Sequence, residues 1–224
     1  MFARLELGRI AGIAVYLDMM FVLVLLVFTY PYFTSGNTPM MSAGVVIVVG
    51  LLVSILLHEL GHAFVGRLFD ANVSHIELTG LGGLAHFERS LPHSALARSA
   101  IYLAGPAVNL GLWQGMTMLA GEAGAGGNAM LALPLAVLAS ANFFLMCFNL
   151  LPAYPLDGGQ TLDAWLGWVL GPVWSVRIVA TLGLVVAVGV AVMAFPSGIF
   201  LLLVALFLGQ ANLEALRSVG RWRR

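Results

Sequence analysis

The residues best suited to chemistry lie in one short stretch, His58-Glu59-Leu60-Gly61-His62. Residues four apart on a helix share a face, so the imidazoles of His58 and His62 can reach one metal ion. Zinc suits nitrogen ligands, and it lowers the pKa of a coordinated water toward neutrality. The carboxylate of Glu59 projects beside them, where it can accept a proton from that water. The spacing is therefore typical of a hydrolytic zinc site.

The composition indicates what kind of scaffold must hold this stretch. Hydrophobic residues make up 61% of the 224-residue chain and charged residues only 9%. A soluble domain carries about 25% charged residues, so we expect an all-α polytopic membrane protein with a small β region on its cytoplasmic face. The basic residues form no run before the C-terminus, which argues against nucleic-acid binding. The single cysteine excludes a disulfide within the chain.

Apolar runs predict six transmembrane helices within a single membrane-embedded domain over residues 1–224. Their approximate ranges are 19–34, 41–69, 96–119, 130–151, 173–194 and 197–216. Asp18 is the expected cap of the first helix. Residues 2–17 and 70–92 predict short strands outside the apolar slab, and residues 161–170 predict a short helix.

The basic residues predict the orientation in the membrane. With six helices, all of them fall on one face: Arg4, Arg9, Arg67, Arg89, Arg98, Arg177, Arg217, Arg221, Arg223 and Arg224. The positive-inside rule makes that face, and both termini, cytoplasmic, which predicts a multi-pass protein of the cell membrane. His58 is about 15 Å from the predicted end of its helix. We therefore expect an active site within the membrane, nearer its cytoplasmic face.

Ionisable side chains inside a membrane usually mark function, because each costs about 2.5–3.5 kcal/mol to insert. A catalytic zinc ion commonly has three protein ligands and one open position. Asp157 is the best third ligand, because prolines and glycines break the helix around it and such backbone at membrane depth lines cavities. The alternative is a solvated aspartate in a cytoplasmic loop.

Three motifs together resemble the site-2 protease family of intramembrane zinc metalloproteases: HELGH, the later FNLLPAYPLDGG, and GPAVN at Gly105–Asn109. The resemblance covers nearly the whole chain. It implies that His58, His62 and Asp157 hold one zinc ion, that Glu59 is the general base and that Asn149 binds the substrate or the oxyanion. The implied form is compact, since neither a PDZ domain nor a C-terminal regulatory domain fits this length.

The resemblance also implies an activity, which is hydrolysis of a peptide bond in or near the transmembrane segment of a single-span substrate protein. The Gly82-Gly83 strand would receive the extended substrate at a sheet edge; the alternative is an ordinary surface hairpin. Asn142 is a weaker substrate-binding candidate, with an interhelical hydrogen bond as its alternative. Asn109 is a candidate partner of a metal ligand. The substrate identity and the oligomeric state are not predicted.

Two other functions are compatible with histidines and an aspartate in membrane helices. A zinc or other ion transporter should place ligands on several helices along a pathway, whereas this chain offers one compact cluster. A noncatalytic membrane scaffold should lack Glu59 or a ligand, and all are present. His75, His86 and His93 have no helical spacing and are assigned no metal.

Overall fold

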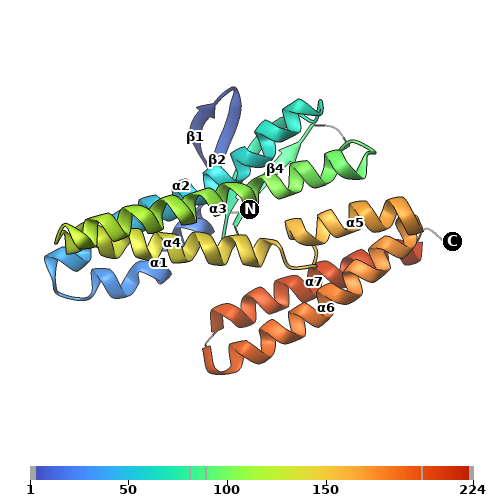
Figure 1. The fold of residues 1–224 in the computed structure, drawn as a ribbon. Coiled ribbons are helices and arrows are strands. Elements are labelled where there is room, and N and C mark those ends of the chain that lie inside the picture. Colours follow the sequence, from blue (N-terminus) through green and yellow to red (C-terminus); the bar gives the residue numbers. More distant parts are fainter. Residues whose placement is uncertain (1–3, 81, 89, 198, 222–224) are drawn as a thin grey trace. The chain divides into compact units, whose positions relative to one another are not determined.

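The computed structural model describes the chain except residues 1–3, 81, 89, 198 and 222–224. Strands and helices follow in this order: β1 (Arg4–Ile10), β2 (Ile13–Asp18), α1 (Met19–Phe33), α2 (Thr38–Leu68), β3 (Val73–Thr79), β4 (Gly82–Phe87), α3 (Ala95–Ala125), α4 (Ala129–Asn149), α5 (Asp157–Leu170), α6 (Pro172–Ser197) and α7 (Ile199–Arg221) (Figure 1). The chain divides into two compact units, and each is described by itself. The first unit comprises residues 1–91 and 104–146, and the second comprises residues 92–103 and 147–224.

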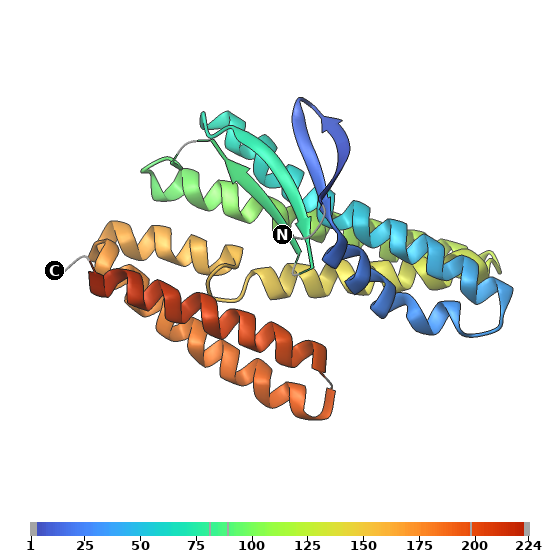
Figure 2. The ribbon, with the colours of Figure 1, turned by 180° about the vertical axis from the view of Figure 1, so that it is seen from behind.

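The first unit contains one four-stranded sheet in the order β1-β2-β3-β4. The outer pairs are antiparallel, while β2 and β3 are parallel and are joined through α1 and α2. Both hairpins can be followed in Figure 2. β1 and β4 are therefore the two edges, and β1 carries a bulge between Glu6 and Gly8. The strands predicted in residues 2–17 and 70–92 are confirmed.

The core of the first unit lies where α1 and α2 pack on the sheet. Its buried apolar side chains are Ile13, Leu17, Phe21, Leu25, Leu60, Ala63, Val73, Ile76 and Leu78. The predicted cap is confirmed, because the Asp18 carboxylate accepts a hydrogen bond from the backbone N–H of Met20 at 2.9 Å. Gly61 lets α2 approach α3 closely, since a Cβ there would lie 2.9 Å from the Ala104 carbonyl oxygen. This approach brings α3 beside the HELGH turn.

The second unit is built around the antiparallel helices α6 and α7, with α5 packed on α6. Its apolar core contains Ala153, Leu156, Ala187 and Leu208. The carboxylate of Asp163 on α5 pairs with the Arg98 guanidinium at 3.2 Å and accepts a hydrogen bond from the Ser175 hydroxyl. These contacts tie the middle of α5 to the starts of α3 and α6.

A helix is present at each of the six predicted positions, but the prediction of six transmembrane helices is confirmed only for four. Among the described residues, helices long and apolar enough to cross a membrane are Thr38–Leu68, Ala129–Asn149, Pro172–Ala194 and Ile199–Val219. α1 has 15 residues and contains Pro31, which is short of the about 20 residues that a bilayer requires. α3 is long, but its glycines and polar side chains dilute its apolar character.

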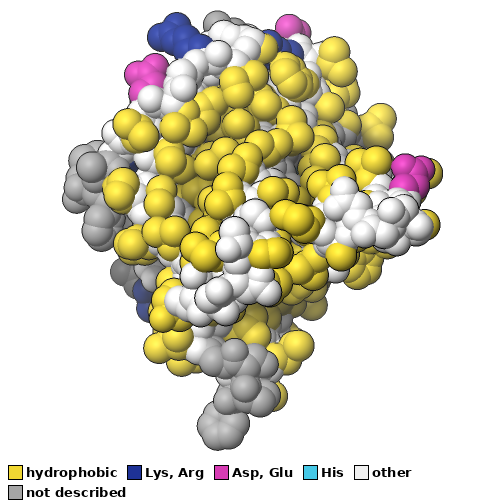
Figure 3. Space-filling view, turned by 90° about the vertical axis from the view of Figure 1, so that its left-hand side faces the viewer, with side chains coloured by type: hydrophobic (Ala, Val, Ile, Leu, Met, Phe, Trp, Pro, Cys, Tyr) yellow, Lys and Arg dark blue, Asp and Glu magenta, His cyan; other side chains and the backbone are white. Residues whose placement is uncertain are grey.

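Hydrophobic side chains cover most of the face shown in Figure 3, and the few charged groups in view lie near its margins. Exposed apolar residues are numerous on the candidate spans, among them Val49, Phe144, Val188 and Leu206. Such a surface is stable in lipid and not in water. Of the arginines used to predict orientation, Arg89, Arg223 and Arg224 lie outside the described residues.

Candidate active site

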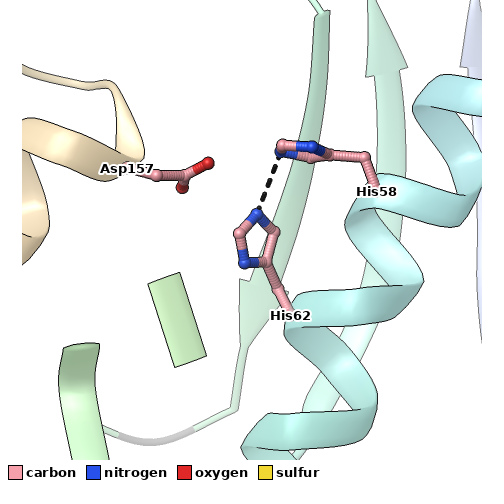
Figure 4. Close-up of side chains that lie close together, drawn as sticks. All are labelled: His58, His62 and Asp157. Carbon is pink, nitrogen blue, oxygen red and sulfur yellow. Dashed lines mark hydrogen bonds between the residues drawn. The ribbon is translucent and has the colours of Figure 1, made fainter. Parts of the chain in front are cut away.

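Two imidazoles from α2 face one another within the first unit. The side chains of His58 and His62 are one helical turn apart and their Nε2 atoms are separated by 3.1 Å (Figure 4). Each residue is only 6% exposed. The predicted pairing of these two residues on one helix face is therefore present, at a point where water has little access.

A chain of hydrogen bonds fixes the orientation and the tautomer of His58. The amide N–H of Asn142 donates to the Leu138 carbonyl oxygen at 2.9 Å and to the Ser54 hydroxyl at 3.0 Å. The amide oxygen of Asn142 must then accept from the Nδ2 of Asn109, at 2.8 Å. The remaining oxygen of Asn109 lies 2.5 Å from His58 Nδ1. Since an amide oxygen only accepts, Nδ1 of His58 carries a proton, and in the neutral ring Nε2 then presents a lone pair.

The Nε2 atoms of His58 and His62 border a small space that stays open because Gly105 has no side chain. A Cβ built at Gly105 on α3 would overlap Nε2 of His62 and would lie 2.6 Å from Nε2 of His58. In metal sites, a histidine typically directs the lone pair of one ring nitrogen into such a space while its other ring nitrogen donates a hydrogen bond to a partner behind the ring. The donor set and the space therefore fit a zinc ion.

Glu59 lies between the two histidines in sequence and beside the sheet in space. It is 5% exposed, and a Cβ built at Gly83 would overlap its side chain. β4 is an edge strand, and Gly83 lies near its start. The first unit therefore brings the expected base next to the Gly82-Gly83 segment that was expected to receive the substrate.

Asp157 and Asn149 belong to the second unit. Asn149 is the last residue of α4 and Asp157 is the first residue of α5. Gly158 and Gly159 allow a tight turn there, because a Cβ at either position would overlap the backbone of Leu150 or Ala153. The aspartate carboxylate thus starts a helix, where the helix dipole favours a negative charge.

Asn212 of α7 holds the loop that leads to Asp157. Its side-chain oxygen accepts from the Tyr154 backbone N–H at 3.1 Å, and its Nδ2 donates to the Tyr154 carbonyl oxygen at 2.8 Å. Gly183 on α6 makes room for this amide, which is fully buried. Burial raises the pKa of the Tyr154 phenol above its ordinary value, and the negative charge of Asp163 acts in the same direction. The phenol is therefore neutral.

Sequence reasoning located some of these groups and missed others. The first unit brings together His58, Glu59, His62, Gly83 and the expected metal-ligand partner Asn109. Asn142 is fully buried and bonded to two helices, which is the interhelical alternative. Asn149 and Asp157 remain predictions as site residues. Ser54 and Asn212 were missed, although a lone polar residue in an apolar run is a usable signal.

Comparisons with known proteins agree with this arrangement. The model of peptidase family M50 matches residues 46–121 and 113–196. A Synechocystis protein provisionally named a zinc metalloprotease is 33% identical over 181 residues, which are 75% of this chain and 45% of that protein. A zinc metalloprotease of Methanocaldococcus jannaschii is 32% identical over 206 residues, which are 91% of this chain and 58% of that protein.

A solved structure is similar over almost the entire chain. It is a site-2 protease from Methanocaldococcus jannaschii, with a TM-score of 0.68 and 27% sequence identity over 96% of this chain and 95% of that one. This chain spans about half the length of the curated relatives named above. The family model covers both the HELGH turn and the Asp157 turn. The chain therefore belongs to peptidase family M50, the family of the site-2 proteases.

Proposed function

We propose that this chain is an intramembrane zinc metalloendopeptidase that cleaves a peptide bond in or near the transmembrane segment of single-span proteins. The observation that carries the proposal is the buried His58-Glu59-His62 turn on a helix long enough to cross a membrane. Asn109 behind His58 supports it, because a polarised imidazole is what a metal ligand requires. The relatives are named zinc metalloproteases, which supports the metalloprotease part of the proposal.

The metal would be held by His58, His62 and Asp157, which offer two imidazole nitrogens and one carboxylate oxygen. These donors suit zinc, and three protein ligands leave a fourth position open for catalysis. When bound, zinc supplies Lewis-acid polarisation and lowers the pKa of a coordinated water. The residue type of Asp157, its place at the start of α5 and its position in the family motif support its role as the third ligand.

The proton transfers fall to Glu59. Its carboxylate would accept a proton from the attacking water and then deliver it to the departing amine. Burial beside two imidazoles keeps the carboxylate out of bulk water, so proton exchange with solvent is limited. Asn149 would donate a hydrogen bond to the oxygen of the scissile carbonyl as negative charge develops there.

The substrate would be presented as an extended strand along β4. A transmembrane segment must lose its helical hydrogen bonds before a protease can reach its backbone, and an open sheet edge replaces them. The close approach of Gly83 to Glu59 supports this route, because it puts the edge next to the base. Gly82, with a φ of 129°, adopts a backbone that a larger residue would disfavour.

The proposed setting is the cell membrane, with both termini in the cytoplasm. The arginines expected on that side include the described Arg4, Arg9, Arg67 and Arg98, which lie on or next to the sheet or at the start of α3. His58 is ten residues before the last residue of α2, about 15 Å along the helix. The active site would then lie below the cytoplasmic surface of the bilayer.

Glu59→Gln tests the proposed function. The amide keeps the shape of the side chain but cannot accept the proton, so we expect cleavage of a single-span model substrate to fall by about 10²- to 10⁴-fold. Zinc content should remain at the wild-type level, because Glu59 is not a ligand. Substrate cleavage in liposomes and metal analysis of the purified protein are the two measurements.

Glu122→Gln is the matched control, since Glu122 is exposed at the far end of α3 and should change neither quantity. Undiminished cleavage by the Glu59 variant would show that the proposed base is wrong. Zinc uptake into liposomes by the wild type, without cleavage of any model substrate, would favour a transporter instead.

A further inference from the structure

A second group of metal-ligating side chains lies on the sheet of the first unit. His75 and Glu77 are two apart on β3 and so point to the same face, and His86 on β4 is the direct cross-strand partner of His75. One donor atom from each residue lies within 4.8 Å of the others. None of these residues belongs to the proposed active site.

The contacts of Ser74 set the tautomer of His75. The Ser74 hydroxyl donates its one proton to the carbonyl oxygen of His86, at 3.0 Å, and its oxygen lies 2.9 Å from His75 Nδ1. Nδ1 of His75 must therefore be the donor in the second contact. In the neutral ring, Nε2 then carries a lone pair, and it is the ring nitrogen that faces Glu77.

The spacing of the donors suits a metal better than direct hydrogen bonds. Nε2 of His86 lies 3.4 Å from Glu77 Oε2, and Nε2 of His75 lies 3.6 Å from Glu77 Oε1. Hydrogen bonds between nitrogen and oxygen span about 2.7–3.2 Å. Ligands of one tetrahedral zinc ion, at about 2.0–2.2 Å from it, are about 3.3–3.5 Å apart. Nε2 of His86 is buried and has no hydrogen-bond partner among the described residues.

The imidazoles of His75 and His86 lie next to each other on one face of the sheet. The imidazoles of His75 and His86 stack with centroids 4.3 Å apart and planes at 10°. Tyr16 packs edge-on against His75. Glu77 is 9% exposed, and His75 and Glu77 line a surface cavity of about 560 Å³ through which an ion can enter. The group is therefore accessible, and one imidazole would turn out of the stack so that the lone pairs of both rings point at the same ion.

Arg4 supplies the charge that competes with an ion. Its guanidinium pairs with Glu77 Oε1 at 2.5 Å, while the other carboxylate oxygen faces His86. Arg4 is about half exposed and can swing into solvent, because its side chain is 48% accessible. A bound cation would therefore share Glu77 with Arg4 or displace it.

We propose that His75, Glu77 and His86 form a second divalent metal site, separate from the active site, that joins β3 to β4. Two imidazoles and one carboxylate favour zinc or a neighbouring transition ion over calcium or magnesium. An ion there would pin the strand whose Gly83 lies beside Glu59. The site is independent of the proposed protease activity and can be tested without it.

Zinc binding is measured best in full-length protein from which the first site has been removed. The protein carries His58→Ala and His62→Ala and is purified without a histidine tag. Equilibrated with micromolar Zn²⁺ alone, this variant should retain about one ion per chain, as measured by mass spectrometry of metal content. Adding His75→Ala and His86→Ala should abolish that ion. His93→Ala is the matched control and should leave it in place, since His93 is exposed and outside the group.

Two further variants guard against a change in folding. Glu77→Gln should weaken zinc binding at least tenfold while circular dichroism of the protein is unchanged. Arg4→Gln should strengthen binding by about three- to tenfold, because a like charge next to the ion is removed. A loss of fold cannot produce that gain. The proposal is overturned if the His58/His62 variant holds no zinc, or if it holds zinc equally well without His75 and His86.

Discussion

At the scale of single residues, a series of hydrogen bonds runs from a backbone carbonyl oxygen to the ring of His58 and determines which ring nitrogen carries the proton. The carbonyl of Leu138 orients Asn142, Asn142 orients Asn109, and Asn109 sets the tautomer of His58. Leaving a buried amide unpaired costs free energy, so these hydrogen bonds form together as one network. The residues of the network belong to three helices, α2, α3 and α4.

Asn109→Leu should break this chain at the link next to the ligand. Without the amide oxygen, His58 can carry its proton on either nitrogen and can rotate, so zinc affinity should fall by about 10- to 100-fold. Competition with a chromophoric chelator measures the affinity. Asn128→Ala, in the exposed turn before α4, is the control and should have no effect. An unchanged affinity in Asn109→Leu would mean that His58 is held by other contacts.

Gly105→Ala should fill the space in front of the two imidazoles. Overpacking costs about 1–3 kcal/mol, which corresponds to a loss of about one to two orders of magnitude in zinc affinity. Gly111→Ala on the same helix is the matched control, because a Cβ there meets nothing within 4 Å. Equal zinc content in the two variants would show that the metal does not occupy this space.

Sequence patterns predicted the candidate metal ligands more readily than the residues that hydrogen-bond to those ligands. The turn from His58 to His62 is local, because two side chains four apart on a helix must share a face. The partner of His58 depends instead on how α3 is rotated against α2, which no local pattern encodes. For the same reason His75 and His86, eleven positions apart, showed no metal spacing in sequence. The register of β3 with β4 makes them neighbours.

At the scale of elements, the irregular turn before α5 is held by a side chain of another helix. The turn before α5 has a few backbone hydrogen bonds of its own, and Asn212 of α7 adds two to the backbone of Tyr154. Elements were predicted well where their hydrophobic pattern is strong, as in α2, α4, α6 and α7. The parallel pairing of β2 with β3 could not be predicted, because the strands are separated by both α1 and α2.

Asn212→Leu should loosen this turn. The backbone N–H and C=O of Tyr154 would lose their partners, at a cost of about 1–3 kcal/mol. We expect a lower midpoint of thermal unfolding in detergent and, if Asp157 is the third ligand, weaker zinc binding as well. Gln210→Leu on the same helix, at an exposed position, should leave both unchanged. A stability equal to the wild type would show that the turn holds itself.

At the scale of the whole molecule, the number of membrane crossings decides on which side each loop lies. Within the described residues, four helices qualify by length and composition, and α1 and α3 do not. If all six cross, the N-terminus and the α1–α2 turn at Gly36 lie on opposite sides of the membrane. If only four cross, they lie on the same side.

Reporter fusions should find both termini in the cytoplasm and Gly36 outside. Alkaline phosphatase is active only outside the cytoplasm, so we expect activity from an insertion at Gly36 and none from fusions to either end. A green fluorescent protein fused to the C-terminus is the complementary control and should fluoresce. Phosphatase activity at the N-terminus would reverse the orientation, and inactivity at Gly36 would reduce the count of crossings.

The two edges of the sheet differ in a way that bears on what the protein can capture. β1 carries Arg4, Glu6 and Arg9 and is interrupted by a bulge, and both features discourage another strand from pairing there. β4 has no formally charged residue and begins with two glycines. An extended segment that pairs with this sheet would therefore have one suitable edge, β4, and that edge lies beside Glu59. Substrate selection would then begin with backbone pairing at this edge, before any substrate side chain is bound.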